Sequence, residues 1–173
     1  LTVSSLPANC FGTSTGTVTA SGSGGVTPYN YLWPTLGSST LSSVTTAPAG
    51  TYSVTLTDAN GCVITKSITV TQPSSLTLTS ALTPATCGNA NGSGTVTVSG
   101  GSPAYTYNWS NGGISSILTG ALAGTYSVTV KDENNCIVSD TIIIQENGDV
   151  LPSEMYMPNA FSPNDDGTND QQL

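Results

Sequence analysis

Histidine and arginine are absent from this 173-residue sequence, and its two basic side chains are Lys66 and Lys131. Proton transfer near neutral pH and activation of a nucleophile both need a titratable base beside the reacting group. The carboxyl groups of Asp165 and Asp166 are adjacent in the sequence, so in an extended segment they point to opposite sides. The sequence therefore predicts no enzyme activity and no catalytic residues.

Charge is also scarce, because Asp, Glu, Lys and Arg make up 7% of the chain and the formal net charge is -8. Binding to nucleic acid or to an anionic membrane depends on clustered basic side chains, so we expect neither partner. The sequence has no run of about 20 apolar residues that could span a membrane. Leu1 falls in phase with the start of a repeat, so we expect another repeat upstream, with any export signal outside this sequence or in its last segment.

A seven-residue sequence occurs twice and organises the chain. Residues 49–55 and 123–129 both read Ala-Gly-Thr-Tyr-Ser-Val-Thr, and each copy leads through a polar turn to a cysteine, Cys62 or Cys136. Motif and cysteine both recur after 74 residues. A repeat of this length is the size of a small domain. We therefore predict domains over residues 1–74 and 75–150, followed over 151–173 by a linker and the first strand and loop of a further β domain.

Alternating residues around each motif predict β-strands. Tyr52, Val54 and Leu56 fall on one face of an extended chain, with hydroxyl side chains on the other face. Such alternation is typical of a half-buried strand. The following Asn60-Gly61 dipeptide favours a type I′ hairpin turn. Short strands separated by clusters of Gly, Pro, Ser and Asn are typical of β-sandwiches, so the predicted fold class is all-β with two tandem sandwiches.

Each predicted domain contains two cysteines, Cys10 with Cys62 and Cys87 with Cys136. Small domains bury little apolar surface and often depend on a covalent cross-link. Four cysteines allow three pairings. Because repeated domains should close in the same way, we predict the disulfides Cys10–Cys62 and Cys87–Cys136, and with them an oxidising compartment. Zinc ligation by four thiolates is the alternative, but Cys-x-x-Cys spacing and histidine are both missing.

Trp33 and Trp109 occupy the same place in the two repeats, each after two alternating tyrosines. A tryptophan on the third strand of such a sandwich is normally buried, and we predict core positions for both. The alternative is a platform on which sugar rings stack, which requires exposed indole rings.

The tryptophan strand, the Gly-Thr-Tyr-Ser-Val sequence and the Asp-x-Asn-Gly turn together resemble the immunoglobulin-like (Ig-like) repeats of the polycystic-kidney-disease (PKD) type. With the cysteines added, residues 1–148 resemble more specifically the SprB repeat, which occurs in very long surface adhesins of gliding Bacteroidetes. The resemblance implies Ig-like, PKD-like sandwiches and a role in adhesion at the cell exterior.

The last segment resembles the opening of the gliding motility-associated C-terminal domain. The residues that carry this resemblance are Pro158, Asn159, Phe161, Pro163, Asn164, Asp166, Gly167, Asn169 and Asp170. In that family the domain is the type B sorting signal of the type IX secretion system. The resemblance therefore implies secretion across the outer membrane, with the type IX translocon and outer-membrane attachment proteins as partners.

Two further sites have alternative interpretations. Asn164, Asp166 and Asp170 surround a glycine with a spacing similar to that of calcium loops, but we favour Asx-turns, in which these side chains bond to their own backbone. No other cofactor is expected. The Asp140-Thr141-Ile142 triplet resembles the O-glycosylation acceptor of Bacteroidetes, which makes Thr141 a candidate for modification.

These features favour a non-enzymatic cell-surface adhesin. Its repeats would act as a stalk, and its last segment would direct type IX secretion and surface attachment for gliding motility. An extracellular surface or a polysaccharide is the expected kind of ligand. The alternative is that the repeats are spacer or carbohydrate-binding modules of a secreted type IX enzyme. A third hypothesis, a filament subunit, requires head-to-tail contacts between sandwiches.

Overall fold

The computed structural model describes residues 1–148, which form strands and, over that range, no helix. Six strands in the first half make two three-stranded sheets. One sheet has the order β1 (Thr2–Leu6), β2 (Gly16–Ser21) and β4 (Ser43–Ala47). The other has the order β3 (Asn30–Leu32), β5 (Gly50–Thr57) and β6 (Val63–Val70). All paired neighbours are antiparallel.

The second half repeats this arrangement. One sheet contains β7 (Thr77–Thr83), β9 (Gly92–Ser99) and β11 (Ile117–Ala121), and the other contains β10 (Thr106–Trp109), β12 (Gly124–Lys131) and β13 (Ile137–Ile144). A short parallel pair, β8 (Ala85–Thr86) with β14 (Glu146–Asn147), is added in this half. The repeat in the sequence is thus a repeat in topology.

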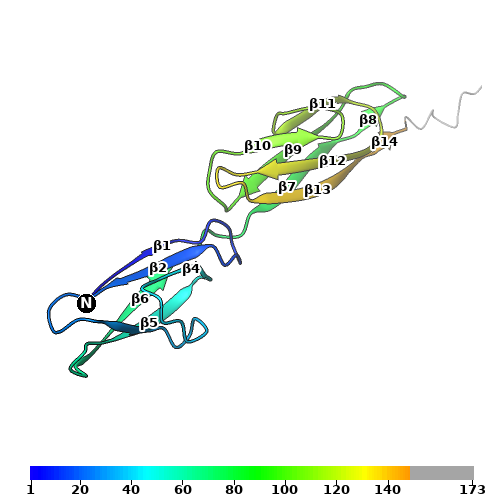
Figure 1. Ribbon diagram of the computed structural model, residues 1–173. Helices are drawn as coiled ribbons and strands as arrows, with labels where there is room; N and C mark the ends of the chain where they lie inside the picture. Colours follow the sequence, from blue (N-terminus) through cyan, green and yellow to red (C-terminus); the bar gives the residue numbers. More distant parts are fainter. Residues whose placement is uncertain (149–173) are drawn as a thin grey trace, which may run out of the picture.

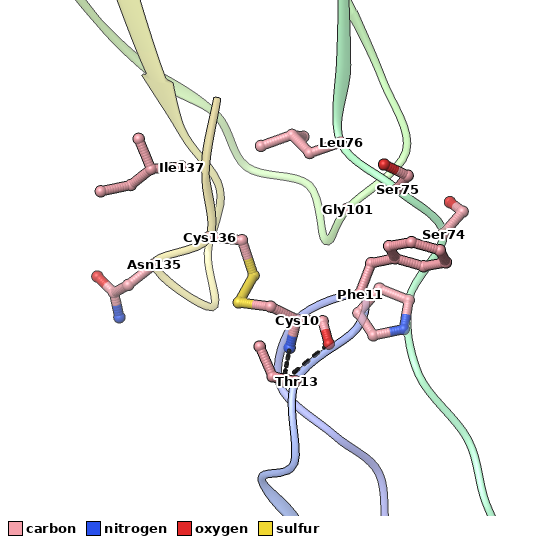
Figure 2. Close-up of a pocket in the computed structure, with 11 residues that line it drawn as sticks. Cys10, Phe11, Thr13, Ser74, Ser75, Leu76, Gly101, Asn135, Cys136 and Ile137 are labelled. Atoms are coloured by element: carbon pink, nitrogen blue, oxygen red, sulfur yellow. Dashed lines mark hydrogen bonds between the residues drawn. A yellow bond between two sulfur atoms is a disulfide. The ribbon is translucent and has the colours of Figure 1, made fainter. Parts of the chain in front are cut away.

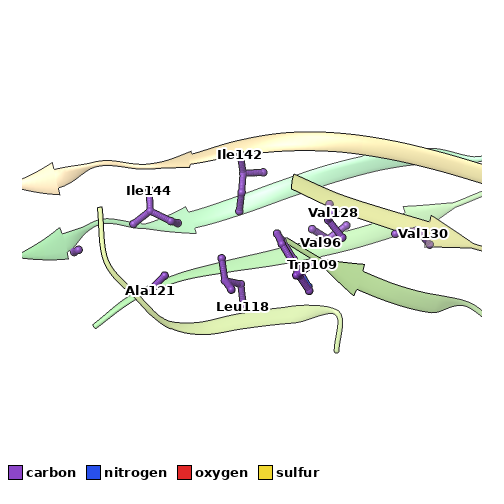
Figure 3. Packing of buried hydrophobic residues seen from close by; sticks show 9 residues of the cluster. Val96, Trp109, Leu118, Ala121, Val128, Val130, Ile142 and Ile144 are labelled. Atoms are coloured by element: carbon purple, nitrogen blue, oxygen red, sulfur yellow. The ribbon is translucent and has the colours of Figure 1, made fainter. Parts of the chain in front are cut away.

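Each pair of sheets encloses its own apolar core. In the first half the buried core residues are Val18, Ala20, Trp33, Ala47, Tyr52, Val54 and Val70. Figure 3 shows the core of the second half, formed by Ala85, Val96, Trp109, Leu118, Ala121, Val128, Val130, Ile142 and Ile144. The predicted alternation is confirmed, because Tyr52, Val54 and Leu56 are all buried. The two cores share no residue, so the predicted class of two tandem β-sandwiches is confirmed.

The two sandwiches lie end to end (Figure 1), with the N-terminus in one and β14 at the far end of the other. In the first sandwich, Leu6 pairs with Thr17, and Gly16 pairs with Ala47. These residues mark the end that meets the second sandwich, which we call the junction. Thr57 and Val63, which pair with each other, mark the opposite, outer end. The chain therefore reaches the junction at the ends of β1, β4 and β6 and leaves it along β2 and β5.

The turn between β5 and β6 differs from the predicted type I′ turn. Gly61 has a positive φ of 80°, and Asn60 is not among the residues with positive φ. The turn is closed instead by the Gly61 N–H, which donates to the Asp58 carbonyl at 3.0 Å. The Asp58 carboxylate also accepts the Asn60 N–H at 2.9 Å and the Cys62 N–H at 2.8 Å. Because the Asp58 side chain bonds to these backbone N–H groups, the turn does not adopt the geometry of an ideal two-residue hairpin.

Candidate functional site at the domain junction

One disulfide joins the two sandwiches across the junction. Cys10 lies on the loop after β1, and Cys136 ends the turn between β12 and β13; their sulfur atoms are 2.00 Å apart and their Cα atoms 5.7 Å apart. Figure 2 shows the bond between the two loops. The predicted disulfides Cys10–Cys62 and Cys87–Cys136 are therefore wrong, and so is the expectation of one disulfide within each sandwich.

The length of the strands explains this correction. Cys10 is at the junction, whereas Cys62 follows β5 at the outer end of the same sandwich. β5 contains eight residues, which at about 3.3 Å each cover roughly 26 Å. A disulfide needs Cα atoms within roughly 4.4–6.8 Å of each other. The same separation holds in the second sandwich, where Cys87 lies beyond β8 at the outer end and Cys136 lies at the junction.

Asp132, in the same turn, holds Cys136 in place by a hydrogen bond. Its side chain is only 4% exposed. One carboxylate oxygen accepts the Cys136 N–H at 2.8 Å, and the other accepts the Ser102 N–H at 2.9 Å. Gly101 makes this approach feasible, because a Cβ atom there would lie 2.7 Å from the Asp132 carboxylate. The carboxylate thus fixes both the turn and the neighbouring loop.

Hydroxyl groups hold the opposite loop. The Thr13 hydroxyl donates to the Cys10 carbonyl at 2.9 Å and lies 3.3 Å from the Cys10 N–H, as the dashed lines in Figure 2 mark. The Asn9 N–H donates to the Thr15 hydroxyl at 2.8 Å. The Gly12 N–H donates to the Gln72 side-chain oxygen at 2.8 Å, which ties this loop to the linker between the sandwiches. The loop that carries Cys10 is therefore held by several hydrogen bonds.

A side-chain hydrogen bond crosses the junction beside the disulfide. The Asn134 amide donates to the Asn9 carbonyl at 3.0 Å and to the Ser102 hydroxyl at 2.9 Å. The Gly101 N–H donates to the carbonyl of the linker residue Ser74 at 3.0 Å. The sequence did not single out these residues, because Asn134 repeats Asn60 and looked like turn chemistry alone. The junction is thus held by a covalent bond, by polar contacts and by the linker.

A cavity of about 360 Å³ lies between the two loops and the linker. Phe11 and the linker residue Ser74 line it from one side and Ile137 from the other (Figure 2). Phe11 is 57% exposed and Ile137 is 65% exposed. The junction is therefore covalently closed but not tightly packed.

The equivalent turn at the outer end of the first sandwich is built in the same way around Asp58, which is 6% exposed. The backbone N–H groups of Val26 and Cys62 donate to its carboxylate and hold the pKa of Asp58 below its ordinary value, against the opposing effect of burial. Cys62 itself is an exposed free thiol. The first sandwich therefore presents a cysteine at its outer end with no disulfide partner among residues 1–148.

Both tryptophans are core residues, as predicted. Trp33 is 0% exposed and Trp109 is 2% exposed. Their indole N–H groups donate to the carbonyls of Leu41 at 3.0 Å and Ser115 at 2.8 Å. A ring buried in this way cannot stack on a sugar, so the alternative of a tryptophan platform is wrong.

The remaining predicted sites differ in what the structure says of them. Thr141 is exposed on β13, so its modification stays a prediction. The calcium candidates Asn164, Asp166 and Asp170, and the whole sorting-domain motif, lie outside the described residues. Among residues 1–148, no group of three His, Cys, Asp or Glu side chains is placed to hold a metal ion. Over the same range, no helix has the length and apolar character needed to cross a membrane.

Comparison with known proteins supports the repeat. The family model described as the SprB repeat matches residues 2–37 and 79–113. These two regions begin in or beside the first strand of each sandwich and end beyond the tryptophan. No match was found among curated proteins. The sequence resemblance to SprB repeats is thus supported in both halves of the chain.

Solved structures give weaker likenesses. The amphioxus IgVJ-C2 molecule is 12% identical with a TM-score of 0.36, and the match covers 83% of this chain and 96% of that one. The fibronectin(III)-like modules of Clostridium thermocellum CbhA are 15% identical with a TM-score of 0.29, covering 84% of this chain and 95% of theirs.

Proposed function

We propose that residues 1–148 are a stalk segment of a non-enzymatic adhesin displayed at the cell surface. The observation that carries this proposal is the Cys10–Cys136 disulfide, which joins two sandwiches arranged end to end. A stalk must keep its length and direction while its ends are pulled apart. Two sandwiches connected only by a short linker would pivot about it, whereas a second covalent connection resists that motion.

The position of the disulfide also decides how tension passes through the chain. The two cysteines are separated by 126 positions in the sequence. When the ends of the chain are pulled, tension passes from Cys10 directly to Cys136, and the residues between them are bypassed. Most residues of both cores lie between Cys10 and Cys136. Each core can therefore unfold without adding the full length of this segment to the stalk.

Stretching single molecules by their ends tests this proposal. The locked segment of 126 positions would release about 450 Å if fully extended, at about 3.6 Å per residue. We expect the oxidised chain to unfold without this gain and the Cys10→Ser variant to show it. The Cys62→Ser variant is the matched control and should behave like the unchanged chain. A full-length gain in the oxidised chain contradicts the proposal.

The finer functional assignment rests on the sequence resemblances. We propose type IX secretion and attachment at the outer surface, with a role in gliding. Beads coated with antibody against residues 1–148 should bind to intact cells and travel along them. Loss of the type IX translocon should abolish surface binding. Beads that bind without moving would indicate a static stalk, and unchanged binding without the translocon would reject the sorting assignment.

A further inference from the structure

The outer end of the first sandwich has the same construction as the surface that receives Cys10 at the junction. We infer that this end is a socket for the cysteine-bearing loop of another repeat, and that Cys62 forms a disulfide with that loop. The occupant is a repeat of the same kind, placed in line before Leu1. The inference goes beyond the stalk proposal and depends on the geometry of the two ends, wherever the chain is displayed.

The first step is the match between the two cysteine turns. The Asp58 N–H donates to the Cys62 carbonyl at 3.0 Å, and the Asp132 N–H donates to the Cys136 carbonyl at the same distance. Each aspartate carboxylate accepts the N–H of its cysteine at 2.8 Å. Cys62 is therefore presented in the same way as Cys136, which already forms a disulfide with a neighbouring sandwich.

The second step is an open cavity beside Cys62. It has a volume of about 170 Å³ and is lined by Leu1, Gly25, Cys62 and Val63, among others. At the junction, the residues in the same places of the second sandwich line the cavity that the Cys10 loop borders, and these are Leu76, Gly101, Cys136 and Ile137. The first sandwich thus carries the receiving half of the junction without the loop that forms the opposite wall.

Glycine at one position supports the match independently. Gly25 and Gly101 have positive φ angles of 72° and 65°. A Cβ atom on either would lie 2.7 Å from the carboxylate of Asp58 or Asp132, respectively. Both ends therefore have the same close contact between a glycine of the loop and the aspartate of the cysteine turn.

The chemistry identifies the occupant. At the junction the socket receives a loop that begins just after the first strand of a sandwich and carries Cys10 and then Phe11. Val63 is 62% exposed and Ile64 is 44% exposed at the outer end, so they offer an apolar wall for the cavity, as Ile137 does at the junction (Figure 2). A repeat in line supplies both the thiol and an apolar residue for the opposite wall of the cavity.

Formation of the new bond requires an oxidant, and a disulfide of an oxidoreductase or a small molecule supplies it. The thiolate of Cys62 attacks one sulfur of that disulfide and releases the other sulfur as a thiolate. The thiolate of the incoming loop then attacks the Cys62 sulfur and releases the second thiolate of the oxidant. Two electrons pass to the oxidant, and the two thiol protons pass to water.

The test is a longer chain in which a copy of residues 1–75 precedes Leu1. After oxidation, we expect the added copy of Cys10 to be bonded to Cys62, while Cys10 remains bonded to Cys136. Proteolysis and mass spectrometry identify both bonds, and Cys62 loses its reactivity toward alkylating reagents. A Cys62 that stays reactive, or that pairs with any other cysteine, overturns the proposal.

A matched variant tests whether the position of the thiol within the turn matters, or whether closeness of the two loops is enough. In the longer chain, Cys62→Ser combined with Asn60→Cys moves the thiol by two positions within the same turn. The unchanged Cys10–Cys136 bond verifies that the fold is intact. We expect the yield of the new disulfide to fall sharply in this variant. An equal yield would show that any thiol on the turn suffices, and the socket proposal would be wrong.

Discussion

The cysteine turns of the two sandwiches have the same shape but different partners. In both turns an aspartate carboxylate accepts the cysteine N–H at 2.8 Å. Cys136 is bonded to Cys10, whereas Cys62 is an exposed thiol. The difference arises because the loop of a neighbouring sandwich lies opposite the Cys136 turn, whereas no sandwich within residues 1–148 lies opposite the Cys62 turn (Figure 1). The fold of a single sandwich therefore specifies how the thiol is presented, and a neighbouring sandwich specifies whether it is bonded.

Removing the buried tryptophans should have the largest effect and should show whether the sandwiches fold independently. We expect Trp33→Ala and Trp109→Ala each to lower the free energy of unfolding of its own sandwich by about 3–5 kcal/mol. In each variant the other tryptophan reports on the unchanged sandwich by fluorescence, while circular dichroism follows the whole chain. Equal loss in both sandwiches would show that they unfold as one unit.

Replacing the aspartate behind the junction turn should have the next largest effect. Asp132→Ala removes the acceptor of two backbone N–H groups, and we expect a loss of about 2 kcal/mol in the second sandwich. It should also slow the return of the Cys10–Cys136 disulfide after reduction, because Cys136 is no longer held. Alkylation followed over time measures that rate. Asp58→Ala is the matched control, and a similar slowing in it would contradict the local role of Asp132.

The polar contact across the junction should have a smaller effect. Asn134→Ala removes the bonds to Asn9 and Ser102, which should cost about 1 kcal/mol of junction stability. Since the disulfide masks this loss, small-angle scattering should be compared after reduction, and a broader range of interdomain orientations is expected. Asn60→Ala, at the equivalent place in the outer turn, should leave the scattering unchanged.

Acid should loosen the outer turn, with the smallest effect. The N–H groups of Val26 and Cys62 lower the pKa of Asp58 from its ordinary value of 3.8. The stabilisation by this carboxylate is complete above that value and is lost as the pH falls through the lower pKa of the folded state. NMR shifts of the Val26 and Cys62 amides should therefore change below pH 3.8. A transition centred above that pH would contradict this account.

The strands and cores were predictable from the sequence because the signals are local. Tyr52, Val54 and Leu56 alternate with hydroxyl side chains, and the same pattern after the second motif buries Val128 and Val130. Alternation of apolar and polar side chains indicates which face of a strand is buried, and this signal does not depend on distant parts of the chain. The tryptophans were placed correctly for a similar reason, since their position after two alternating tyrosines marks a core strand.

The disulfide was not predicted because its geometry depends on the whole chain. The assumption that each repeat closes on itself paired Cys10 with Cys62. Four strands, β2 to β5, nevertheless lie between these cysteines. β3 and β4 both run toward the junction, and β2 and β5 both run away from it, so Cys10 and Cys62 lie at opposite ends of the sandwich. Counting strands does not give this result, because consecutive strands in different sheets need not reverse direction, and only the structure shows which residue faces Cys10.

Mapping the disulfide in the oxidised chain tests the central claim most directly. Trypsin cleaves after Lys66 and Lys131 and gives the fragments 1–66, 67–131 and 132–173. The structure predicts that, without reduction, the fragments 1–66 and 132–173 remain joined through Cys10 and Cys136. If instead the fragment 1–66 is released alone and 67–131 is joined to 132–173, each sandwich is closed by its own disulfide and the covalently held junction is wrong.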